Sequence, residues 1–154
     1  MVEFSQGRPE ESLGYMLWQT CNLWQRKIVR ALSPTDLTLV QFALLAGIAW
    51  LERAPEPITQ VRLARYLNMD AMMTSQVLRR LESKGLVSKK ASGSDSRANI
   101  VMLTEKGADL VTKALELVHG VESGFFRSLD ISHDEFMKSL ESLIESNESD
   151  KEMN

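Results

Sequence analysis

The sequence predicts a mainly α-helical fold with one small β-hairpin, an α+β arrangement, and three observations support it. Apolar residues recur at helical spacing through most of the 154 residues. The spacing changes over residues 86–103, where two short runs typical of strands flank a polar loop. A tight turn at residues 68–70 separates two short helical segments just before that hairpin. A chain of this length can bury a sizeable core, so we expect one globular fold.

Two helices are predicted in the first third of the chain. Residues 12–32 form an amphipathic helix, because apolar side chains recur on one face: Leu13, Met16, Leu17, Trp24 and Ile28. The Ser33-Pro34 pair ends this helix, since proline disfavours the helical conformation in the preceding residue. Thr35 or Asp36 is then expected to cap a second helix that runs to about Glu52.

A helix–turn–helix is predicted over the next thirty residues. Thr59 is expected to cap a short helix, and Asn68 tolerates the left-handed conformation that a tight turn needs. Asp70 can accept amide protons at the start of the following helix, where its charge also suits the helix dipole. That helix runs from about Ala71 to Lys84, and Gly85 ends it.

Two short strands and two further helices complete the chain. The strands are predicted over residues 86–91 and 99–103, on either side of the polar loop 92–98. Thr104 caps a long helix, and Ser132 with Glu135 forms a capping box for a last one. The charged tail from about Asn147 is expected to be disordered. Helix–turn–helix followed by a hairpin is the layout of a winged helix-turn-helix, here with flanking N- and C-terminal helices.

The bulk composition excludes several classes of protein. No apolar run approaches the roughly 18 residues of a transmembrane helix, and the polar N-terminus predicts no signal peptide. One cysteine cannot form an internal disulfide, which favours a cytoplasmic location. The sequence contains no glycine-rich phosphate loop and no Ser/His/Asp or Cys/His set, so nothing in it suggests an enzyme. We therefore expect no catalytic residues and no cofactor.

The charge is unevenly distributed along the chain. The net charge is −3, which is unusual for a nucleic-acid-binding protein. Residues 58–107, however, contain nine lysines and arginines against four acidic residues, so this segment carries +5 and the remainder −8. A basic middle segment that coincides with the helix–turn–helix and the hairpin favours DNA as the partner.

Residues 35–107 resemble the MarR family, the multiple-antibiotic-resistance type of winged helix-turn-helix regulators. The likeness rests on five runs, at residues 37–45, 58–67 and 73–87, Asp-Ser-Arg at 95–97 and Met-Leu-Thr-Glu-Lys-Gly at 102–107. The resemblance implies a transcriptional regulator, expected to be a repressor, that binds pseudo-palindromic DNA as a homodimer and is released by a small ligand or signal. It also implies a division of the chain: a DNA-binding lobe over 35–103, dimerisation helices over 10–34 and 104–147, and a disordered tail over 148–154.

The helix–turn–helix and the wing contain the residues expected to meet DNA. In sequence order these are Thr59, Arg65, Thr74, Ser75, Gln76, Arg79, Arg80, Lys89, Lys90 and Arg97. Gln76 suits adenine, and Arg79 suits guanine or a phosphate. Met72 and Met73 can touch thymine methyl groups or simply pack. The alternative for Arg79 and Arg80 is a solvated helix face.

The tip of the wing is expected to enter the minor groove. Arg97 suits the negative potential there, and Asp95 can orient its guanidinium by a charge-assisted hydrogen bond. The alternative is that this pair only stabilises the turn. Relatives often have a basic residue where Asn99 stands, so the wing here offers one phosphate contact fewer.

Ligand and redox sensing are further hypotheses. The resemblance implies a cleft for a small aromatic or phenolic ligand, for which Tyr15, Trp18, Arg26 and Trp50, with Trp24, are candidates; the alternative is that these aromatic residues belong to the core. Cys21 is the only thiol, but the family's sensing cysteine aligns with Gly14, so a packed residue is favoured over a redox sensor. His119 and His133 have no partners at ligand spacing, so no metal site is predicted. The rival to the regulator is a winged helix that binds protein and not DNA.

Overall fold

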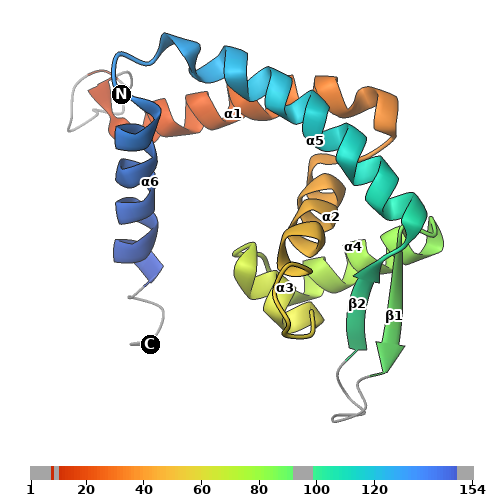
Figure 1. The fold of residues 1–154 in the computed structure, drawn as a ribbon. Coiled ribbons are helices and arrows are strands. Elements are labelled where there is room, and N and C mark those ends of the chain that lie inside the picture. Colours follow the sequence, from red (N-terminus) through yellow and green to blue (C-terminus); the bar gives the residue numbers. More distant parts are fainter. Residues whose placement is uncertain (1–7, 9–10, 92–98, 149–154) are drawn as a thin grey trace, which may run out of the picture. The chain divides into compact units, whose positions relative to one another are not determined.

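The computed structural model describes Arg8 and residues 11–91 and 99–148 (Figure 1). The chain forms two compact units, residues 1–121 and 122–154. The elements are α1 (Leu13–Leu32), the 3-10 turn η2 (Ser33–Thr35), α2 (Leu39–Leu51), α3 (Gln60–Tyr66), α4 (Ala71–Ser83), β1 (Val87–Ala91), β2 (Asn99–Leu103), α5 (Glu105–Phe125), the 3-10 turn η3 (Phe126–Ser128) and α6 (His133–Glu148). The order and type of the predicted elements are thus confirmed.

The start of α2 differs from the prediction. Neither Thr35 nor Asp36 caps this helix: Thr35 belongs to η2, and Asp36 is left-handed at φ 53°. The cap is Thr38, whose hydroxyl accepts a hydrogen bond from the Gln41 amide at 3.2 Å, while the Gln41 side chain accepts one from the Thr38 amide at 3.1 Å. This capping box satisfies two amides that would otherwise lack partners.

The turn between α3 and α4 follows the sequence-based expectation. Thr59 caps α3 by accepting from the Arg62 amide at 3.2 Å. Asn68 is left-handed at φ 49°, and Asp70 caps α4 by accepting from the Met73 amide at 2.8 Å. Gly85, at φ 70°, lies just beyond the end of α4. Local chemistry therefore sets both ends of α4.

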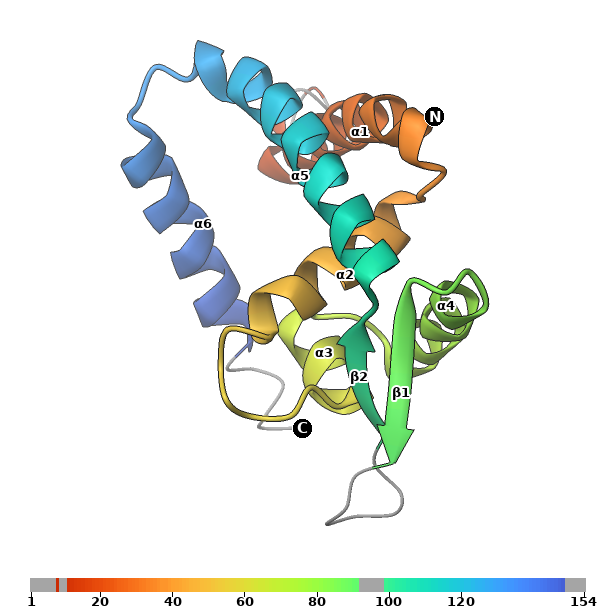
Figure 2. The same ribbon diagram turned by 45° about the vertical axis from the view of Figure 1, so that its right-hand side comes forward.

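The hairpin is tied to the body of the first unit along both strands. β1 pairs antiparallel with β2, from Val87 opposite Leu103 to Ala91 opposite Asn99. β1 contacts α4, whereas β2 contacts α2 and α3, and Figure 2 shows β2 between α3 and β1. The outer edge of β2 is also paired, because the Val101 amide donates to the Ile58 carbonyl at 2.8 Å. The Leu103 amide donates to the Glu52 carboxylate at 3.1 Å. The base of the wing is therefore fixed to the end of α2.

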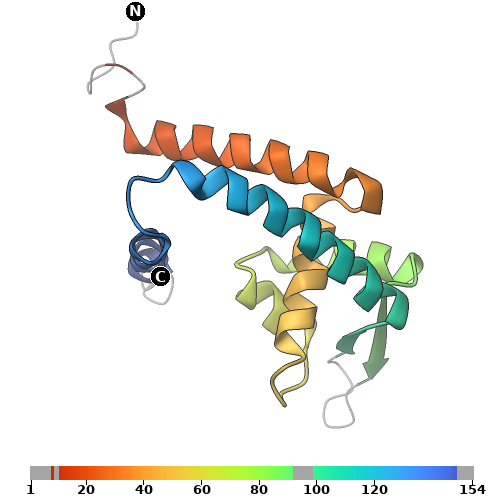
Figure 3. The same cartoon turned by 45° about the horizontal axis from the view of Figure 1, so that its top comes forward.

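One apolar core joins the helices of the first unit. Leu44, Leu45 and Ile48 of α2 are fully buried, and they pack with Leu63, Leu78 and Leu81 of α3 and α4. The same cluster includes Ile28 and Leu32 of α1 and Val111, Ala114 and Val118 of α5, two helices that lie side by side in Figure 3. The core therefore links α4 to the two long helices.

Within the described residues, no single helix has the length and apolar character needed to cross a membrane. α1 with η2 passes such a test only in combination with α2, and the two are bent by 78° at their junction. The apolar character of α2 follows from its burial in the core.

The second unit consists mainly of α6 and a small aromatic cluster. The Ser132 amide and hydroxyl donate to the Glu135 carboxylate at 3.0 and 2.7 Å, and these bonds lower the pKa of Glu135. The predicted capping box is thus confirmed. The Phe126 ring lies 5.1 Å from that of Phe125 and 6.0 Å from that of Phe136. Because α6 extends through Glu148, the tail expected from Asn147 cannot begin before 149, and residues 149–154 lie outside the described part of the chain.

Candidate nucleic-acid interface

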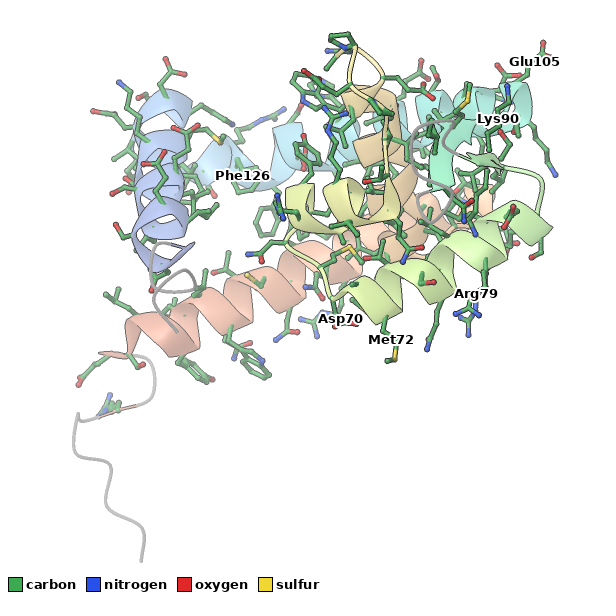
Figure 4. The ribbon with its side chains drawn as sticks, turned by 90° about the horizontal axis from the view of Figure 1, so that it is seen from below. Asp70, Met72, Arg79, Lys90, Glu105 and Phe126 are labelled. Carbon is green, nitrogen blue, oxygen red and sulfur yellow. The ribbon has the colours of Figure 1, made fainter. Side chains whose placement is uncertain are left out.

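The outward face of α4 is the first feature of the candidate interface. Thr74, Leu78 and Leu81 are fully buried against the core, which fixes the rotation of the helix. The opposite face carries residues at spacings of four, three and four, which fall in one line on an α-helix. We call this line the outer stripe: Met72, Gln76, Arg79 and Ser83, all exposed. Figure 4 shows Met72 and Arg79 projecting from the same side of α4, away from the core.

The structure contradicts the expectation for Thr74. Its side chain is fully buried, and its hydroxyl donates to the Asp70 carbonyl one turn earlier at 2.8 Å. The helix itself satisfies this hydroxyl, so a threonine can face the core at no cost in unpaired polar groups. Thr74 is therefore a core residue and not a DNA contact. Ser75 next to it is half-buried, and Gln76 is exposed.

Ion pairs occupy three of the basic side chains of this region. Arg62 pairs with Glu56 at 3.2 Å, Lys84 with Asp36 at 3.1 Å and Lys89 with Glu82 at 2.8 Å. The Lys89 side chain is only 18% exposed. Lys89 is therefore less available to a phosphate than its position in the sequence suggests.

Four other basic side chains are exposed and form no ion pair within the described residues: Arg65 of α3, Arg79 and Arg80 of α4 and Lys90 of β1. The Arg79 Nε donates to the Ser75 carbonyl one turn earlier, at 3.4 Å. Thr59, also predicted to meet DNA, is half-buried and engaged as the cap of α3. Asp95 and Arg97 fall in 92–98, outside the residues that the structure describes. Positive charge free for a partner thus lies on the outer face of the helix–turn–helix and on the wing.

The structure brings together only some of the predicted ligand residues. A groove of about 570 Å³ runs along α1, lined by Trp18, Gln19, Asn22, Gln25, Arg26, Val29 and Arg30. Tyr15 lies beside Trp18, with 6.2 Å between the ring centroids. Trp50 lies elsewhere, on α2, where the Arg53 guanidinium is 4.5 Å from its ring centroid. Trp24 packs against the core, so the core alternative holds for this residue.

Cys21 and the two histidines show no sign of a shared site. Cys21 is exposed on α1, and His119 and His133 are exposed on α5 and α6. Among the described residues, no group of three or more histidine, cysteine or acidic side chains is placed to hold a metal ion.

A tight junction that the sequence analysis does not predict joins the turn after α4 to the start of α5. The Leu86 carbonyl accepts from the Thr104 amide at 3.1 Å, and the Thr104 hydroxyl donates to the Gly85 carbonyl at 2.7 Å. Gly107 lies so close that a Cβ added there would be 1.9 Å from the Leu86 oxygen. A glycine in the first turn of a helix, against its low helix propensity, was the available signal.

The amino-acid sequence is similar to those of known transcriptional regulators. The MarR family pattern matches residues 37–98. The chain is 37% identical over 136 residues to YdcH, an uncharacterized HTH-type transcriptional regulator of Bacillus subtilis (strain 168), covering 88% of this chain and 92% of that protein.

Solved structures show the same fold over nearly the whole chain. The transcriptional repressor CouR bound to a 23-mer DNA duplex matches with a TM-score of 0.75 and 27% identity, covering 94% of this chain and 98% of that one. A cysteine-to-serine mutant of MarR from E. coli, complexed with operator DNA, matches with a TM-score of 0.72 and 30% identity, covering 87% and 91%. The winged helix-turn-helix prediction is thus confirmed, and the expectation that the chain is not an enzyme agrees with the family. The chain belongs to the MarR family of HTH-type, DNA-binding transcriptional regulators.

Proposed function

We propose that this regulator is a repressor that acts in the cytoplasm and binds a pseudo-palindromic operator as a homodimer, with the outer stripe of α4 in the major groove. The observation that carries the proposal is that the outer stripe includes Arg79, an exposed basic side chain that lacks an ion pair within the described residues. Three more exposed basic side chains without such ion pairs lie on α3, α4 and β1. A helix fits the major groove, where each base pair presents its own pattern of donors and acceptors. The relatives solved on DNA, a repressor on a duplex and MarR on its operator, support this assignment.

The side chains of the lobe divide into two roles under this proposal. Gln76 can bond both edge atoms of an adenine, and Arg79 those of a guanine or a phosphate. Arg65, Arg80 and Lys90 hold phosphates, which positions the protein without reading sequence. Arg97 reaches the minor groove with Asp95 orienting it. Ser75 is half-buried beside the stripe, and its hydroxyl can bind a phosphate at the edge of the interface.

A homodimer is supported by apolar side chains that the single chain leaves exposed. Leu13 and Leu17 near the start of α1 are 89% and 57% exposed, and Leu143 and Ile144 of α6 are 60% and 55% exposed. Burial of such residues drives association. A two-fold dimer places two recognition helices in successive major grooves, about 34 Å apart, and the operator repeats with the same symmetry.

A small aromatic acid is the proposed signal, held by the groove of α1. Trp18 offers a ring face and Arg26 a partner for a carboxylate, and both line that groove. The ligand must bind more tightly to a dimer whose recognition helices are wrongly spaced for DNA than to the DNA-binding form. Equal affinity for the two forms would leave their populations unchanged. Duplex release by 4-hydroxybenzoate, weakened in Trp18→Ala, would support this part of the proposal. Cys21 has no role in it.

The experiment for the DNA proposal is selection from a pool of random short duplexes at low and moderate salt. Wild type is expected to enrich a palindromic sequence. Arg79→Ala is expected to bind that sequence at least about thirty-fold more weakly, because one base contact of about 1 kcal/mol or more is lost in each of the two half-sites. Fluorescence anisotropy on the enriched duplex measures both affinities.

Lys113→Ala is the matched control, because it also removes one exposed positive charge, from α5 and not from the helix–turn–helix. It should bind like wild type. Absence of duplex binding by wild type at low salt would contradict the proposal and favour the protein-binding winged helix. Equal losses in Arg79→Ala and Lys113→Ala would mean that α4 does not face the duplex.

A further inference from the structure

Met72 is a large exposed apolar side chain in the first turn of α4, on the same face of the helix as Arg79. It is 70% exposed, more than any other large apolar side chain in the described part of residues 35–103. It lies on the outer stripe, and Figure 4 shows it on the same side of α4 as Arg79. The core does not use this residue, since α4 packs through Thr74, Leu78 and Leu81 on the opposite face.

The charges of the helix–turn–helix indicate what covers Met72. Arg79 and Arg80 on the same helix and Arg65 on α3 are exposed and form no ion pair within the described residues. Such a charge favours a polyanion over an apolar protein surface. In the major groove of DNA, the apolar group at a base edge is the 5-methyl of thymine. An unbranched thioether side chain can adapt to such a small apolar target.

The spacing along α4 places this contact next to the one proposed for Gln76. Met72 precedes Gln76 by four residues and Arg79 by seven, which is about 6 and 10 Å along the helix axis at 1.5 Å per residue. Successive bases of one strand are about 3.4 Å apart. Met72, Gln76 and Arg79 can therefore meet bases within one half-site.

We propose that Met72 is a specificity-determining residue that reads the 5-methyl group of one thymine in each half-site, near the base met by Gln76. Met73 does not share this role: it is 42% exposed and lies off the line of the outer stripe. The inference rests on the proposed function, because it requires α4 in the major groove.

Uracil in place of thymine tests the proposal, since it removes the methyl group and keeps the base pairing. Each thymine of the enriched duplex is replaced in turn, symmetrically in both half-sites. For wild type, one such position is expected to weaken binding about fifteen-fold, roughly four-fold for each of the two methyl groups left out of contact. For Met72→Ala, the thymine and uracil duplexes should bind equally at that position. Met73→Ala is the matched control and should keep the wild-type loss.

Three results would overturn the inference while the DNA proposal stands: an enriched half-site without thymine, a uracil effect that persists in Met72→Ala, or one that disappears in Met73→Ala. Failure of wild type to bind any duplex at low salt would overturn both proposals. The thermal unfolding of Met72→Ala should match that of wild type or exceed it slightly, because the side chain is exposed and alanine favours helix. A loss of affinity in this variant therefore reports the contact and not the fold.

Discussion

Replacing Gly107 with alanine is expected to lower the free energy of unfolding by about 3 kcal/mol, the upper range for overpacking a well-packed site. The added Cβ would lie 1.9 Å from the Leu86 carbonyl oxygen and 2.9 Å from the Leu86 carbonyl carbon. Both atoms belong to the backbone, so no side chain can rotate away, and α5 or β1 must shift. A shift would strain the bond from the Thr104 amide to the Leu86 carbonyl. Urea unfolding at fixed protein concentration measures the change.

Gly120→Ala provides the control within the same helix. A Cβ at Gly120 meets no described atom within 4 Å, so the substitution should stabilise the chain by about 0.5–1 kcal/mol through helix propensity alone. The two glycines are thus expected to give effects of opposite sign. Stabilisation by Gly107→Ala would contradict the close approach of α5 to the start of β1.

The sequence predicted the features that depend on neighbouring residues. The caps at Thr59, Asp70 and Ser132 and the left-handed turn at Asn68 follow from side chains within three residues of the groups they satisfy. Their chemistry is local, so the order of residues is sufficient to find them. Both ends of α4 were predictable in this way.

Features that join distant parts of the chain could not be predicted in the same way. The Lys89–Glu82 ion pair joins β1 to α4, and the Glu52 carboxylate reaches the Leu103 amide 51 residues away. The hydroxyl of Thr74 suits a phosphate oxygen or a base edge, which predicts a place at the interface, whereas in the structure it is satisfied within the helix and the side chain is buried. The cap of α2 was misplaced because the left-handed Asp36 delays the start of that helix. Tertiary packing decides the two long-range contacts and the burial of Thr74, whereas the capping box of Thr38 and Gln41 is local and was open to prediction from the sequence.

The affinity for operator DNA is expected to fall about a thousand-fold between 50 and 200 mM salt, because about six phosphate contacts release counterions on binding. Arg65, Arg80 and Lys90 supply three contacts per protomer in our proposal, and all are exposed without an ion pair within the described residues. The double variant Arg65→Ala, Arg80→Ala removes four contacts per dimer, so the slope of log affinity against log salt should fall in magnitude by about 3–4. Anisotropy titrations at several salt concentrations measure that slope.

Two neighbouring lysines on β1 allow the effect of a phosphate contact on the salt dependence to be distinguished from the effect of net charge. Lys90→Ala should reduce the slope by about two per dimer, one for each protomer. Lys89→Ala changes the net charge equally, but this side chain is bound to Glu82 at 2.8 Å and is 18% exposed, so its effect on the slope should be much smaller. Equal effects of the two substitutions would mean that the duplex responds to net charge and not to the unpaired side chains. A smaller effect for Lys89 would instead show that ion pairing within the lobe selects which basic residues reach the DNA.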